Sequence, residues 1–407
     1  MAAMQQTRIF FCYFARLALS LYVFMRCATM FKDVIGQEYI KRHLIRSVQE
    51  GRVPHAQLFV GMSGVGKLQM ALAYAQYVNC ANRGEHDACG VCPSCRKYAT
   101  LEHPDLHFVF PIEKKGSVSC CDHQVKEFRE IIRERGYFDE SDWNEKIGST
   151  KQTLIYSGES EHIVRKLNFK AYEAPYKVMI IWLPEKMNID CANKILKILE
   201  EPADRTLLLM LSEEPDKLLT TITSRTQIIQ FPLLQEEEIL DALREQYPEL
   251  SEGRLALVAH TARGSYTMAV NQLTQEAGNP YLVQFIELMR KSWLVGFKKD
   301  YTALVQLWEW VDVFVSNNGR EKQKEFLQYS QGFIRENFIR NLQQPDLNYM
   351  TEDEQAFSKN FSPFVNQRNV EALSGEFALA ERHIEQNVNS KIVLFDLMLK
   401  VIVLLKR

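Results

Sequence analysis

A phosphate-binding loop is indicated by the stretch GMSGVGKL, which covers residues 61–68. Gly61, Gly66 and Lys67 fit the pattern G-x-x-x-x-G-K, and Gly64 adds another glycine inside the loop. In such loops the glycines let backbone N–H groups turn toward phosphate oxygens, and the lysine adds a positive charge. These four residues are therefore the candidate nucleotide-binding residues.

The residues that should hold a magnesium ion beside this loop are missing. Leu68 stands where a Ser or Thr hydroxyl normally binds Mg²⁺. The apolar run VMIIWLPEKM should end in a metal-binding acid, but it carries Trp182 there, and its first carboxylate is Glu185. Because phosphoryl transfer needs the metal, the sequence favours a packing role for the loop over ATP hydrolysis. Nucleotide binding without turnover stays open.

Four cysteines form a second chemical motif, with the spacing C-x8-C-x2-C-x2-C. These cysteines are Cys80, Cys89, Cys92 and Cys95. Four thiolates complete the tetrahedral shell of a structural zinc ion, and CGVCPSC makes tight turns that aim sulfurs at one point. We therefore expect structural Zn²⁺ here. The adjacent Cys120 and Cys121 suit neither a mutual disulfide nor one structural site, so we assign them no role.

The elements that must position these residues are those of an α/β fold. A short apolar run at 55–61 leads into the loop, and residues 67–80 have the apolar spacing of a helix. Two further apolar runs, 177–183 and 206–212, are typical of strands buried on both faces, and a helical pattern at 191–202 separates them. Strand, helix and strand in this order predict a doubly wound parallel sheet.

Three other parts of the chain have distinct patterns. Residues 113–157 are mostly polar around the helical stretch HQVKEFREIIRERG, and we expect them to form an insertion on the surface. Residues 235–278 read as a compact set of short helices. From residue 279 to residue 407, amphipathic patterns predict a third domain that is all helical.

Composition marks an ordinary globular protein. The chain has 407 residues, of which 46% are hydrophobic and 25% charged, enough for a large core. With 49 Lys and Arg against 51 Asp and Glu, the formal charge is −2. No global basic field attracts nucleic acid, so any DNA contact must be local or shared with partners. Clustered thiols and a phosphate loop both favour a reducing, cytoplasmic location over secretion.

The first 29 residues, in contrast, have features of a membrane-targeting segment. The stretch RIFFCYFARLALSLYVFMRCATM has Arg8 before an apolar run that Arg16 interrupts, so it resembles a poor signal peptide or a short membrane anchor. Met30 directly precedes FKDVIGQEYIKRHL, where the globular pattern begins. We therefore expect residues 1–29 to be a spurious upstream start or a non-structural extension.

Several ordered motifs resemble one family. They are FKDVIGQEYIKRHL, HAQLFVGMSGVGK, KVMIIWLPEKMNIDCANKILKILEEP and PDKLLTTITSRTQIIQFPLL. Together they are similar to the AAA+ subunits of the bacterial DNA polymerase III clamp loader, over about residues 31–234. The resemblance implies an AAA+ α/β core at 30–234, which carries the zinc module at 80–95, followed by a small helical lid and a helical collar domain.

The resemblance also gives a role to an arginine. The family motif Ser-Arg-Cys falls on Ser224, Arg225 and Thr226, and it implies that Arg225 reaches into the ATP site of a neighbouring subunit. There a cation stabilises the charge on the transferring phosphoryl group. Thr226 replaces the family cysteine without changing that chemistry. ATP-hydrolysing relatives carry a phosphate-sensing arginine where this chain has Thr267.

Three functions are therefore compared. The first is a non-hydrolysing clamp-loader subunit that helps load the sliding clamp on primed DNA, in a hetero-pentamer with gamma/tau-type and delta-type subunits. The second is an ATP-hydrolysing gamma/tau-type motor subunit, which Leu68, Trp182 and Thr267 argue against. The third, a membrane-anchored or secreted interaction protein, rests only on residues 9–25. The first is the function we expect.

Overall fold

The computed structural model describes residues 30–116, 118–149, 151–274, 279–343 and 347–406. The extension expected at residues 1–29 lies outside this part of the chain. Two compact units are present. One covers the described residues up to Ser149 and Thr153–Ala269, and the other covers Lys151, Gln152 and the described residues from Val270 on. Among the described residues, the helices are all too short or too polar to cross a bilayer.

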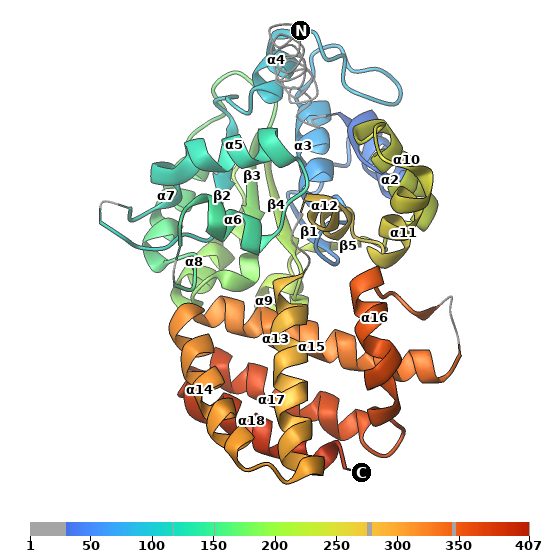
Figure 1. The fold of residues 1–407 in the computed structure, drawn as a ribbon. Helices are drawn as coiled ribbons and strands as arrows, with labels where there is room; N and C mark the ends of the chain where they lie inside the picture. The colour runs from blue at the N-terminus through green and yellow to red at the C-terminus, as the bar shows by residue number, and fades with distance from the viewer. Residues whose placement is uncertain (1–29, 117, 150, 275–278, 344–346, 407) are drawn as a thin grey trace, which may run out of the picture. The chain divides into compact units, whose positions relative to one another are not determined.

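The first unit is built on a parallel sheet of five strands in the order β2-β3-β4-β1-β5 (Figure 1). The strands are β1 Ala56–Val60, β2 Leu106–Val109, β3 Lys177–Trp182, β4 Thr206–Ser212 and β5 Gln227–Gln230. Every residue of β1, β3 and β4 is buried, because helices cover both faces of the sheet. The AAA+ type α/β core is therefore confirmed, while β2 was not expected from the sequence.

Helices precede, connect and follow the strands of this unit, and the last of them, α12, continues past Ala269. They are α2 Glu38–Gln49, α3 Lys67–Val78, α4 Pro93–Ala99, α5 Val125–Arg135, α6 Glu140–Lys146, α7 Ser157–Asn168, α8 Ile189–Glu200, α9 Thr220–Thr223, α10 Glu236–Gln246, α11 Glu252–Thr261 and α12 Tyr266–Thr274. Short 3-10 turns are Phe31–Asp33, Cys121–Gln124, Pro184–Lys186 and Pro215–Lys217. All twelve residues of α3 are buried, which places the helix after the glycine loop in the centre of the core.

The segment at 113–157 does not lie only at the surface, so that expectation was wrong. Its helices α5 and α6 bury Phe128 and Trp143 completely, and the indole N–H of Trp143 donates to Pro111 O at 2.8 Å. Phe128 packs against Trp182 at the end of β3, with ring centroids 5.7 Å apart. The sequence did not indicate that this segment contributes to the core. Its apolar residues are few, and they recur at helical spacing rather than in one continuous run.

Helices are the regular structure of the second unit, whose described residues include no strand. Its helices are α13 Pro280–Trp293, α14 Thr302–Asn317, α15 Arg320–Asn341, α16 Glu352–Phe361, α17 Val370–Glu385 and α18 Ser390–Leu404, with a π-helical turn at Leu294–Lys298 and a 3-10 turn at Ser362–Phe364. Phe285, Phe326 and Phe377 are fully buried in a core that these helices share. Amphipathic patterns after residue 279 thus predicted the helical character of this part correctly.

Candidate functional site

The glycine loop connects β1 to α3, as a phosphate loop does. Gly64 and Gly66 have φ angles of 79° and 92°, which favour glycine because a Cβ is strained there. Gly61 has no room for a side chain, since a Cβ would lie 2.8 Å from Phe231 O. Lys67 is the first residue of α3. The loop geometry that the sequence predicted is therefore present.

The amino group of Lys67 already has several partners within the chain. Its Nζ donates to Gly61 O at 2.5 Å and to Met62 O at 2.7 Å, and it lies 3.6 Å from a carboxylate oxygen of Glu213. Burial lowers the pKa of Lys67, and the charge of Glu213 opposes that shift. Burial likewise raises the pKa of Glu213, against the effect of Lys67. The positive charge thus stabilises the loop itself.

Both positions that lack a metal ligand contribute to packing instead. Leu68 is buried, and Trp182 is 4% exposed, with its ring 5.2 Å from that of Phe138. Glu185 provides the first carboxylate after β3. Its Oε1 accepts hydrogen bonds from the backbone N–H groups of Glu213 and Glu214, at 2.8 and 3.3 Å. This carboxylate oxygen of Glu185 therefore stabilises the segment that follows β4.

The space above the phosphate loop is nearly filled by protein. A cavity of about 20 Å³ remains there, whereas small-molecule sites have roughly 300–1,000 Å³. Its lining comes from the loop, the sheet edge, α12 and the connection between α5 and α6: Ser63, Gly64, Gly66, Lys67, Leu68, Gln69, Tyr137, Phe138, Trp182, Glu213 and Thr267. In this conformation the loop has no room for a nucleotide.

The first turn of α12 packs directly against the phosphate loop. The N–H of Tyr266 donates to Gly64 O at 3.0 Å, and a Cβ on Gly64 would lie 2.8 Å from the backbone nitrogen of Thr267. Thr267 is buried, and its hydroxyl oxygen has no hydrogen-bond partner. A small, buried side chain therefore occupies the position where ATP-hydrolysing members of the resembled family carry a phosphate-sensing arginine.

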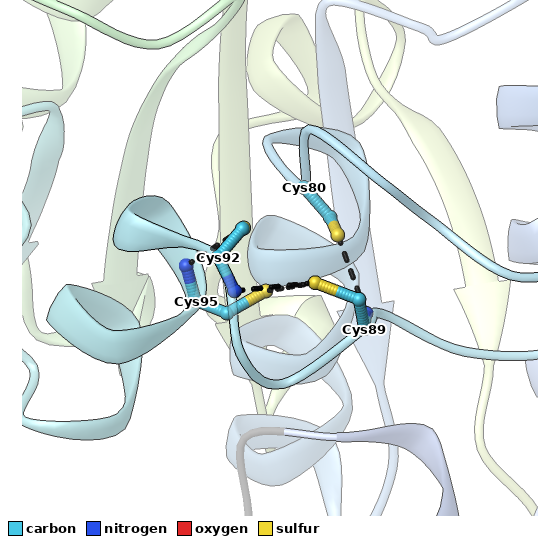
Figure 2. Close-up of side chains that lie close together, drawn as sticks. All are labelled: Cys80, Cys89, Cys92 and Cys95. Carbon is cyan, nitrogen blue, oxygen red and sulfur yellow. Dashed lines mark hydrogen bonds between the residues drawn. The ribbon is translucent and has the colours of Figure 1, made fainter.

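The four cysteines at the end of α3 and around α4 come together in one cluster (Figure 2). Their sulfur atoms all lie within 4.8 Å of one another, and the Sγ atoms of Cys89 and Cys95 are 3.9 Å apart. Sulfurs around a tetrahedral zinc ion, each about 2.3 Å from the metal, are separated by roughly 3.8 Å. The cluster thus fits the donor set of a structural zinc site.

Backbone amides support these sulfurs. N–H groups of Cys89, Cys92 and Cys95 point at the sulfurs of Cys80, Cys89 and Cys92, at 3.3, 3.3 and 3.4 Å. Cys92 is also the N-cap of α4, with Pro93 in the first turn. Hydrogen bonds from the amides of Val91 and Cys92 lower the pKa of Cys89 to about 6. A thiolate, the form that binds zinc, is favoured at that position.

A smaller group surrounds Cys120, to which we gave no role from the sequence. Ligand atoms of Cys120, Asp122 and His162 lie within 4.8 Å of one another. The Asp122 carboxylate, however, is 2.5 Å from Lys166 Nζ. We assign no metal to this group, because a lysine already neutralises its only carboxylate. Cys121 is buried, and its thiol donates to Phe110 O at 3.1 Å.

Arg225 lies at the surface just after α9, outside the residues that line the cavity above the phosphate loop. Its Nη2 is 2.8 Å from Glu200 Oε1, and its Nη1 donates to Thr221 O at 3.0 Å. The side chains of Arg225 and Glu200 are 37% and 49% exposed. An ion pair this exposed contributes at most about 1 kcal/mol to stability, so the guanidinium can exchange Glu200 for another anion at small cost.

Sequence reasoning missed the residues that close the site. Glu213 directly follows β4, and its place at the carboxyl edge of a parallel sheet, beside the loop after β1, could have indicated it. Tyr137 and Phe138 carry no such signal, because they lie in a segment far from the loop in the sequence.

The fold and the loop together define a phosphate-loop α/β protein of the AAA+ type. Residues 36–235 match the family model described as DNA polymerase III, delta subunit. This part of the chain, just under half of it, is therefore similar to the DNA polymerase III subunit family that its motifs resembled, and the degenerate loop points within that family to the delta' type.

Curated relatives agree with this assignment. The delta' subunit of Bacillus subtilis is 30% identical over 210 residues, which cover 52% of this chain and 52% of the relative. The delta' subunit of Pseudomonas aeruginosa is 30% identical over 171 residues, 42% of this chain and 41% of the relative. The tau subunit of Bacillus subtilis is 26% identical over 249 residues, 60% of this chain and 37% of the relative. The chain spans about half the length of these relatives or less.

A solved structure with a similar course of the chain is a DNA polymerase III gamma subunit-related protein from Thermotoga maritima. It is 14% identical in sequence, with a TM-score of 0.40, and the match covers 88% of this chain and 97% of that one.

Proposed function

We propose that the chain is a non-hydrolysing, delta'-type subunit of the DNA polymerase III clamp loader, which helps load the sliding clamp on primed DNA. The proposal rests first on the closed phosphate loop. Lys67 is held by carbonyl oxygens of its own loop, and Leu68 and Trp182 replace the oxygen ligands of Mg²⁺. Similarity to delta' subunits supports the same conclusion.

The active contribution of such a subunit is Arg225, acting in trans. Its surface position and weak pairing with Glu200 are compatible with transfer of the guanidinium to a phosphate in a neighbouring subunit. A planar guanidinium binds two oxygens at once, which suits a phosphoryl group that gains charge in the transition state. The partners would be gamma/tau-type and delta-type subunits in a hetero-pentamer that acts in the cytoplasm.

Zinc has a structural role in this proposal. Cys80, Cys89, Cys92 and Cys95 would hold one Zn²⁺, and four protein ligands leave no open position for catalysis. The ion would connect the end of α3 to α4 and fix the loop between them.

A second candidate is an ATP-hydrolysing gamma/tau-type motor. Two observations favour it: the similarity to tau subunits, and the retained residues Gly61, Gly64, Gly66 and Lys67. Hydrolysis by this chain would require α12 and the connection between α5 and α6 to withdraw from the loop, and it would require a metal ligand that neither Leu68 nor Trp182 provides.

Reconstitution separates the two candidates. The chain would be combined with gamma/tau-type and delta-type subunits and the sliding clamp of the same organism, and ATP hydrolysis on primed DNA would be measured. We expect Lys67→Ala in this chain to leave the rate unchanged, and the equivalent change in the partner motor subunit to abolish it. Loss of hydrolysis with a folded, assembled Lys67→Ala chain would favour the motor, and full clamp loading without this chain would reject both.

A further inference from the structure

The connection between α5 and α6 lies on the phosphate loop, beside α12 (Figure 1). We call residues 136–138 of this connection the latch segment. The side-chain amide of Gln69, in the first turn of α3, donates to Gly136 O. Tyr137 and Phe138 are each 7% exposed, so both rings are almost wholly inside the protein. A segment from the middle of the chain thus occupies the space above residues 61–67.

Tyr137 touches three separate parts of the first unit. Its hydroxyl oxygen accepts a hydrogen bond from the N–H of Ile35 at 3.0 Å. Its ring meets that of Tyr266 edge to face, with centroids 5.1 Å apart. A Cβ on Gly66 would lie 3.2 Å from the Tyr137 hydroxyl oxygen. The side chain therefore connects the segment before α2, the phosphate loop and α12.

Phe138 holds the segment in place from the other side. Its ring packs against Trp182 at 5.2 Å and against Phe128 at 6.0 Å. Leu68 lines the same small cavity as Phe138. The two positions that would normally provide metal ligands, Leu68 and Trp182, are thus part of the apolar surface beside the latch segment.

We propose that the latch segment is a built-in occupant of the phosphate-loop site, which holds the loop and α12 together in place of a nucleotide. A bound nucleotide could join these parts only by contacts to each of them. Here Tyr137 makes such contacts itself, and a cavity of about 20 Å³ is left beside it. This inference goes beyond the clamp-loader proposal, which uses the closure of the loop but gives the segment that closes it no role of its own, and it concerns the isolated chain.

Hydrogen exchange tests the latch on the isolated protein. Tyr137→Ala should speed exchange of the Ile35 and Tyr266 amides by about tenfold or more, because an aromatic contact and a hydrogen bond are both lost. Tyr137→Phe, which keeps the ring, should speed exchange only at Ile35, by roughly threefold to tenfold. A suitable control is Tyr74→Phe, since the Tyr74 hydroxyl bonds Ser47 within the same core at 3.1 Å. This control should leave both amides unchanged.

A nucleotide titration provides the second readout. Wild-type protein should show no shift in melting temperature with millimolar ATP, with or without Mg²⁺, because a ligand that binds the folded state must raise it. Unchanged exchange at Ile35 in folded Tyr137→Phe protein would overturn the latch. So would saturable ATP binding to wild-type protein while the latch segment keeps its protection. Neither result depends on clamp-loader partners, so the latch and the proposed function can fail separately.

Discussion

At the scale of single residues, Arg225 carries the most specific part of the proposed function. Removing its side chain deletes an exposed ion pair with Glu200 and should change the free energy of unfolding by less than about 1 kcal/mol. The expected effect is therefore on the activity of the complex and not on the fold of this chain.

We predict that Arg225→Ala lowers DNA-stimulated ATP hydrolysis and clamp loading by the reconstituted complex, while assembly stays intact. One arginine finger is worth about 10³–10⁵ in rate at a single site, but other ATP sites in the complex reduce the net loss. Arg225→Lys should restore little activity, because an ammonium cannot engage two oxygens in a plane. Arg46→Ala is the matched control, since Arg46 is another exposed arginine paired with a glutamate. If complexes with Arg225→Ala load clamps at the wild-type rate, the trans-acting role of Arg225 is wrong and the chain is a scaffold only.

His107 on β2 should make stability depend on pH. Burial lowers the pKa of His107 to about 4, with Lys166 and Lys177 acting in the same direction and Asp105 and Asp122 opposing them. An unfolded histidine titrates near about 6.5. Between these values the unfolded chain binds more protons, so stability is present above pH 6.5 and falls as the pH drops toward 4.

The expected loss from His107 is up to about 3 kcal/mol across that window. Urea unfolding at several pH values would measure it, and His107→Gln should flatten the curve. His86→Gln serves as the control, because His86 is 85% exposed. An identical pH dependence in wild type and His107→Gln would show that other groups determine it.

At the scale of elements, the cysteine cluster brings together the end of α3, α4 and the loop between them. Helix α4 has only seven residues, fewer than an isolated helix needs, and its N-cap is itself a cluster member, Cys92. Metal binding and the local fold should therefore be coupled.

We predict that one Zn²⁺ per chain copurifies, and that Cys92→Ser loses the zinc and at least about 2 kcal/mol of stability. Metal analysis and thermal unfolding would measure both. Cys191→Ser is a useful control, because Cys191 is a buried cysteine in α8 outside the cluster. Undenatured protein that contains no zinc, or Cys92→Ser protein that melts like wild type, would refute a structural site.

At the scale of the whole molecule, each of the two units has its own hydrophobic core. All the residues of the closed loop belong to the first unit, so the state of that site is a property of the isolated chain. A complex is required only to test the role that we propose for Arg225.

The isolated chain should consequently hydrolyse no ATP above background, with or without primed DNA. Leu68 and Trp182 supply no oxygen to Mg²⁺, and the loop is closed. Phosphate release by purified protein would be compared with that of its Lys67→Ala variant. Turnover like that of a motor subunit, abolished by this substitution, would contradict the proposal.

Local patterns in the sequence determined much of the architecture. The buried strands β1, β3 and β4 are continuous apolar runs, and such runs are recognisable because both faces of a parallel sheet are covered. The cysteine cluster could equally be predicted from the sequence, since its four cysteines lie within sixteen positions of the chain. Loss of the metal ligands at Leu68 and Trp182 followed from residue type alone.

Only the tertiary structure shows which side chains occupy the space beside the phosphate loop. Tyr137 lies about seventy residues beyond the phosphate loop, and only folding brings its hydroxyl to Ile35 and its ring to Tyr266. The same holds for Glu213 beside Lys67 and for Glu200 beside Arg225. Contacts between distant segments depend on which side chains the packed core leaves room for, and no spacing in the sequence encodes that.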